Sequence, residues 1–207
     1  WVQTGMQLRS TVEIPEGTFP EGGTAEDLGK LLLTQIEICL GNFVAARQSI
    51  EEIAARKERV KGLSIAAEVM MGITSMGSGQ PSKADSWFQS VLETEETDVE
   101  ENIAFTNLMM GHNLILAGNY KEAQASLEVS LMRYESTHPD GLMLSLTRVG
   151  LGQLAMCLGD YQSSENQFLA AIAGIERILG KNSINILAIR TMYGQCLNSQ
   201  LRYSEAL

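Results

Sequence analysis

The chain has 207 residues, of which 44% are hydrophobic, and a formal net charge of −10. It is long enough for one or two domains or a short repeat array, and its composition argues against bulk disorder. The acidic balance disfavours direct nucleic-acid binding, which needs Lys and Arg at the phosphates, and disfavours an anionic membrane surface. No apolar run approaches the ~20 residues that cross a bilayer, so we expect no membrane span.

The cysteines give a weak indication of the compartment. Cys39, Cys157 and Cys196 are odd in number and far apart, and none forms a CxxC pair. The chain also has no Asn-x-Ser/Thr glycosylation acceptor. Both features favour a reducing environment, so we expect an intracellular, cytoplasmic location.

Residues 1–24 differ from the rest of the chain. Pro15, Gly17 and Pro20 interrupt regular structure there. Two interpretations stay open: an irregular N-terminal lead-in, or a strap that packs Trp1 or Phe19 onto the following residues. We prefer the lead-in, because chain termini are often loosely held.

From residue 25 onwards, apolar side chains recur at helical spacing and short turns separate the segments. Helices are predicted over residues 27–40, 44–59, 61–75, 82–92, 102–117, 121–134, 142–158, 162–179 and 184–199. The sequence therefore predicts an all-α fold built from helix pairs.

One turn pattern recurs along these pairs. Its clearest copy is Gly118-Asn119-Tyr120, followed by the small residue Ala123. The ring position of the pattern falls at residues 43, 81, 120, 161 and 203, so successive steps are 38, 39, 41 and 42 residues. Pro81 replaces the ring in one copy and is compatible with the first turn of a helix. A nearly fixed step of this length indicates internal repeats.

Two other positions keep the same register. Seven residues before the turn glycine, the first copy has Thr34, and the other four have a glycine: Gly72, Gly111, Gly152 and Gly194. Nine residues after it stands a large apolar residue: Ile50, Phe88, Leu127 and Phe168. Small residues allow helix backbones to approach, and large residues fill the remaining space.

These positions together resemble the tetratricopeptide-repeat (TPR) family, and the long steps are similar to its kinesin-light-chain type. The resemblance implies a right-handed α-solenoid of about five antiparallel helix pairs over residues 25–207. The last repeat should be truncated, because the sequence stops just after its central turn. We therefore expect the chain to be a piece of a longer, multidomain protein.

In this family the first helix of each pair lines a concave groove, so the resemblance implies a groove here. The corresponding positions are mostly apolar, with several amides and one histidine. The candidate partner-binding residues are Leu31, Gln35, Val69, Ile73, Phe105, Leu108, His112, Ile115, Val149, Gln153, Met156 and Gln195. Either they form an adaptable peptide-binding wall, or some of them pack between helices.

Two arginines stand at equivalent places, eleven residues before their turns. Arg148 and Arg190 could hold a ligand carboxylate or phosphate. Alternatively they extend their side chains along the surface into solvent (snorkel) or pair with acidic neighbours such as Glu122 or Glu165, which we prefer. His112 has no partners at metal-ligand spacing, so we expect a packed histidine and no metal site.

No phosphate-binding loop, zinc-protease motif or nucleophile elbow is present, so the sequence predicts no enzyme and no cofactor. We expect a scaffold or adaptor module for protein–protein interaction that binds a peptide or helix in its concave groove. One alternative is a ligand-sensing or autoregulatory segment of a larger signalling or transcription-regulator protein. Self-association is another possible role for such an array.

Overall fold

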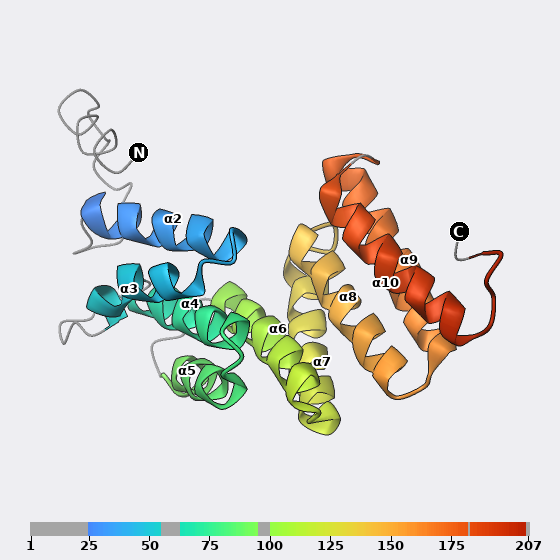
Figure 1. Ribbon diagram of the computed structural model, residues 1–207, viewed down its shortest axis with the longest axis horizontal. Helices are drawn as coiled ribbons and strands as arrows, with labels where there is room; N and C mark the ends of the chain where they lie inside the picture. Colours follow the sequence, from blue (N-terminus) through green and yellow to red (C-terminus); the bar gives the residue numbers. More distant parts are fainter. Residues whose placement is uncertain (1–24, 55–62, 95–99, 182, 206–207) are drawn as a thin grey trace. The chain divides into compact units, whose positions relative to one another are not determined.

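The computed structural model describes residues 25–54, 63–94, 100–181 and 183–205. Over these ranges the secondary structure is helical, without strands, and the predicted all-α fold of adjacent helix pairs is confirmed (Figure 1). The helices are α2 (Ala25–Cys39), α3 (Phe43–Ala54), α4 (Leu63–Gly77), α5 (Pro81–Glu93), α6 (Glu100–Ala117), α7 (Tyr120–Thr137), α8 (Leu142–Cys157), α9 (Tyr161–Leu179) and α10 (Ile184–Ser199). The predicted lead-in or strap at residues 1–24 lies outside the described residues.

The chain divides into two compact units between residues 96 and 97. The first unit contains the pairs α2/α3 and α4/α5. The second contains the pairs α6/α7 and α8/α9 together with α10, which has the place of a first helix in the next pair. A single continuous array over residues 25–207 stays a prediction.

The same helix ending closes each first helix. In the turn after α8, the Gly159 N–H donates to the Met156 carbonyl at 3.1 Å, and the Asp160 N–H donates to the Ala155 carbonyl at 2.9 Å. The same two bonds recur after α2, α4, α6 and α10. This Schellman ending needs a residue with positive φ, which glycine adopts without steric cost. Four of the five turns have glycine there, at φ between 71° and 80°, which explains the recurring turn pattern.

Within each pair, a large side chain of the second helix lies directly against a position without a side chain on the first. A Cβ placed on Gly111 would lie 2.6 Å from Leu127 Cγ, and one on Gly152 would lie 2.9 Å from Phe168 Cε1. Phe88 leaves even less room beside Gly72. Phe88, Leu127 and Phe168 have no exposed surface, so these contacts form the centre of each pair, as the register predicted.

The first pair has a different residue at the position of this glycine. Thr34 replaces the glycine, is fully buried, and donates its hydroxyl to the Lys30 carbonyl at 2.8 Å. Its partner position holds Ile50, which is also fully buried and packs with Leu31, Ile53 and Ala67. A buried hydroxyl needs a hydrogen-bond partner, and the carbonyl of its own helix supplies it.

The glycine contact can be tested by adding one methyl group. We expect Gly111→Ala to lower the free energy of unfolding by about 1–2 kcal/mol, because overpacking a filled core outweighs the better helix propensity of alanine. Urea unfolding followed by circular dichroism measures the change. In a Leu127→Val background, which leaves more room, the cost should shrink. A gain in stability from Gly111→Ala in the otherwise wild-type chain contradicts the close-contact account.

The fifth turn carries a local strain that the other four avoid. Leu201 has φ of 60° at the place of the turn glycine, and its side chain is exposed. The left-handed conformation costs an L-residue roughly 1–2 kcal/mol, so Leu201→Gly should stabilise this turn by up to about 1 kcal/mol after the entropy cost of glycine. Amide hydrogen exchange at Arg202 should slow. Gly159→Ala is the matched control, and it should destabilise its own turn and speed up the amide exchange that follows it. Slower exchange in both variants argues against strain at Leu201.

Candidate partner-binding surface

The structure separates the candidate residues into buried and accessible groups. Leu31, Val69, Leu108 and Val149 are at most 8% exposed and serve the packing of the helices. These four therefore offer little surface to a partner. Three of them belong to hydrophobic cores, each within one unit. For these four residues, the structure favours packing between helices over contact with a partner in a groove.

The other candidates keep accessible surface. Gln35 and Ile73 lie on the first unit, exposed and half-buried respectively. The remaining six lie on α6, α8 and α10 of the second unit: Phe105, His112, Ile115, Gln153, Met156 and Gln195. We call these six the first-helix face of the second unit. Gln195 is exposed and the other five are half-buried.

Polar side chains of this face form a chain across all three first helices. His112 on α6 hydrogen-bonds the Gln153 side chain on α8. Gln153 Nε2 in turn donates to Met192 Sδ on α10 at 3.3 Å. The bond to Gln153 raises the pKa of His112, as expected when an imidazole N–H donates to an amide oxygen. One of the predicted amides is thus hydrogen-bonded within the protein.

The surroundings of His112 set its protonation. Burial lowers the pKa of His112 below its ordinary value, and the hydrogen bond to Gln153 opposes this only in part. The His112 ring also lies close to the backbone of Gly150, where a Cβ would come within 3.3 Å of His112 Cε1. The ring is thus held between helices, as expected for a packed histidine.

The two register-equivalent arginines pair with carboxylates, but not with the two named from the sequence. Arg148 Nη2 lies 3.0 Å from Glu135 Oε1, and Arg190 Nη2 lies 2.8 Å from Glu176 Oε1. Both glutamates stand seventeen residues after their turn glycine, so the same ion pair repeats at two successive junctions. Glu122 and Glu165 were the wrong partners, because they lie near the start of the second helix and the arginines meet its end. Counting the register forward from each turn could have found the pairs.

A polar cluster that the sequence analysis missed joins α9 to the turn after α10. Glu165 accepts from the Tyr193 hydroxyl at 2.8 Å and from Arg202 Nη1 at 2.6 Å. Arg202 also donates to both oxygens of Glu205. The Arg202 hydrogen bond, with help from Tyr193, lowers the pKa of Glu165, while burial first and Glu165 second raise the pKa of Tyr193 to about 12.

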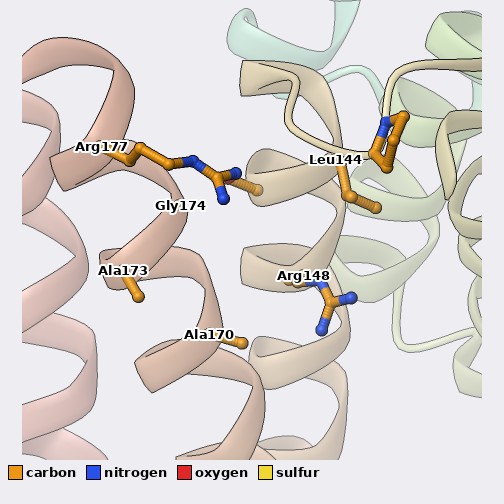
Figure 2. A pocket seen from close by; sticks show the side chains of 8 residues that line it. Leu144, Arg148, Ala170, Ala173, Gly174 and Arg177 are labelled. Atoms are coloured by element: carbon orange, nitrogen blue, oxygen red, sulfur yellow. The ribbon is translucent and has the colours of Figure 1, made fainter.

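A hollow of 210 Å³ opens between α8 and α9. Ala170, Ala173 and Gly174 line it from α9, and Figure 2 shows Arg177 reaching from α9 towards α8. Arg148 on α8 pairs with Glu135, and Arg177 pairs with Asp140 at 2.7 Å. Each guanidinium at the hollow therefore has a carboxylate beside it, so the hollow has no excess positive charge for an anion.

Two further results concern the described part of the chain alone. Its helices include none that combines the length and hydropathy needed to cross a membrane. Among the same residues, no three His, Cys, Asp or Glu side chains gather closely enough to hold a metal ion.

The comparison with known proteins rests on structure. The sequence matches no protein-family model and no curated protein. The crystal structure of BtubC (BKLC) from P. vanneervenii aligns with a TM-score of 0.67 at 14% identity, covering 86% of this chain and 74% of that chain. A crystal structure of a Podosopora anserina putative kinesin light chain with nearly identical TPR-like repeats aligns with a TM-score of 0.66 at 15% identity, covering 89% and 92%.

The chain has a TPR-like repeat fold. The predicted resemblance to the kinesin-light-chain type is thereby supported at the level of structure. At these identities the likeness establishes the fold and leaves the partner open, because unrelated roles use one scaffold.

The histidine on the first-helix face predicts a pH dependence of stability. Since the pKa of His112 is lowered by folding, the unfolded chain binds this proton more readily than the folded chain. The contribution of His112 is complete above its ordinary pKa of 6.5, begins to be lost as the pH falls through that value, and is lost fully only below the lower pKa of the folded state. We expect the free energy of unfolding to decrease as the pH falls below 6.5, and His112→Gln to flatten this slope.

NMR titration of the His112 Cε1 proton checks the cause directly. Gln153→Leu removes the hydrogen bond that favours the charged form, so the pKa of His112 should fall further. A rise in this variant, or a wild-type midpoint above 6.5, contradicts the assigned environment.

Proposed function

We propose that this chain is a non-catalytic module for protein–protein interaction, which binds a peptide or a helix on the first-helix face of the second unit. The observation that carries the proposal is the accessible surface shared by α6, α8 and α10. Half-buried Phe105, Ile115 and Met156 combine there with the exposed amide of Gln195. Repeat arrays commonly use such extended surfaces for binding.

The chemistry of this face favours an apolar partner segment of neutral or positive charge. Its six residues include no Lys, Arg, Asp or Glu, so it lacks the cations that hold an acidic tail. Methionine and isoleucine side chains adapt to apolar ligand side chains, and the Gln195 amide can hydrogen-bond a ligand backbone. The net charge of −10 on the whole chain also steers basic segments towards it.

The cysteines fit an intracellular setting for this role. Cys39 and Cys157 are exposed and Cys196 is buried, and all three are free thiols. Exposed free thiols persist in a reducing compartment, where disulfides are rare. We assign the chain no cofactor and no catalytic step in this proposal.

The proposal is tested with peptides selected from a random display library on the purified chain. We expect Met156→Glu to raise the Kd of the selected peptides at least about tenfold, because it places a charge in an apolar contact. Met132→Glu is the matched control, since Met132 is exposed on the second helix α7; it should leave Kd unchanged. Fluorescence anisotropy measures Kd, and circular dichroism confirms that each variant is folded.

Gln195→Ala gives a second variant, because its exposed side chain can be removed with little effect on packing. A weaker complex is expected from this change as well. Two outcomes contradict the proposal. In one, Met156→Glu and Met132→Glu weaken peptide binding equally. In the other, neither Met156→Glu nor Gln195→Ala changes the Kd of the peptides.

A further inference from the structure

Two positions on the first helices α4, α8 and α10 mark where the preceding helix pair stacks. They lie 12 and 5 residues before the turn residue, and we call them the stacking positions. On α4, α8 and α10 their side chains are at most 3% exposed: Ala67, Thr74, Thr147, Leu154, Ile189 and Cys196.

The contacts at these positions point to the second helix of the preceding pair. Ala67 belongs to a cluster with Ile50 and Ile53 of α3. Thr147 Oγ1 lies 3.0 Å from Ser130 Oγ of α7. Cys196 Sγ donates to the Tyr161 carbonyl of α9 at 3.6 Å. Each of these first helices is therefore covered by the second helix that comes before it in the chain.

The same positions on α2 are open. Gly29 stands at the first of them and has free space around it, and Ile36 stands at the second and is 55% exposed. Leu32 and Leu40 extend the row at helical spacing and are 58% and 67% exposed. We call Leu32, Ile36 and Leu40 the α2 stripe. Three large aliphatic side chains in one row on a stacking face indicate a surface that is covered in the native protein.

The order of the chain identifies the segment that belongs there. The second helices α3, α7 and α9 begin between 20 and 23 residues ahead of the first helices that they cover. Residues 1–24 occupy this interval ahead of α2. We propose that residues 1–24 cover the α2 stripe within the same chain and so cap the first helix pair.

The composition of the segment fits this role. Its large apolar residues are Trp1, Val2, Met6, Leu8, Val12, Ile14 and Phe19. Because the segment is joined directly to α2, its effective concentration at the stripe is high and the association costs little entropy. The interaction would complete the packing of the pair α2/α3, because an open stacking face of a repeat needs a cover for solubility.

A second copy of the chain fits the stripe less well. Three side chains make a patch far smaller than the roughly 800 Å² per partner of a stable interface. Two chains with a formal charge of −10 each also repel one another. The intramolecular occupant therefore has the stronger support.

Photo-crosslinking in the full chain tests the proposal. p-Benzoylphenylalanine replaces Ile36 in one sample and Leu40 in another, and mass spectrometry maps the products. We expect monomer-sized products that join α2 to a peptide from residues 1–24. The control carries the same group at Leu187, which is 65% exposed on α10, and should give no such product.

A further variant separates docking from the mere proximity of a tethered segment. Leu32→Glu in the chain labelled at position 36 should lower the yield about tenfold, because a carboxylate in an apolar contact opposes docking. An unchanged yield overturns the proposal. Dimer-sized products overturn it in favour of a second copy of the chain. If neither label, at position 36 or at position 40, gives a product with residues 1–24, the proposal is overturned as well. Circular dichroism confirms that each chain is folded.

Discussion

The structure depends on one steric constraint, the close contact between a small position of the first helix, which is a glycine in α4, α6 and α8, and a large side chain of the second helix. Because Gly111 and Gly152 present no side chain, Leu127 and Phe168 can lie against the helix backbone itself. The close approach fixes the distance between the helices, since a filled core has no free volume to absorb a change. The short turn with a positive-φ residue then fixes their antiparallel order. The pair is therefore defined locally, within about forty residues of sequence.

Successive pairs are joined by polar contacts in addition to their apolar packing. Within the second unit, the Arg148–Glu135 and Arg190–Glu176 ion pairs and the Ser130–Thr147 hydrogen bond all connect a second helix to the next first helix. Exposed ion pairs contribute little free energy, but their geometry is directional. Apolar contacts supply most of the stability, both within a pair and at stacking positions such as Ala67 and Ile189 between pairs. The polar contacts between pairs add direction to this stacking.

The sequence predicted the fold well because the relevant signals are local. The segment 162–179 was predicted as a helix and α9 runs over Tyr161–Leu179, since both ends carry turn residues. The candidate surface was predicted less well. Leu108 and Val149 share the expected face but are buried, because periodicity shows which way a residue points and not how far a neighbouring helix covers it. The partners Glu135 and Glu176 depend on contacts between pairs, which single-helix patterns do not contain.

The polar groups of the first-helix face also limit what a partner can use there. His112 and Gln153 bond each other, and Gln153 continues to Met192, so part of their hydrogen-bonding capacity is used inside the protein. A ligand that displaced these bonds would leave buried polar groups unpaired, which costs more than a new bond returns. Under the proposed function, selectivity on this face would come from the shape of Phe105, Ile115 and Met156 and from the exposed end at Gln195. An apolar segment with one polar terminus is therefore the ligand form that we propose.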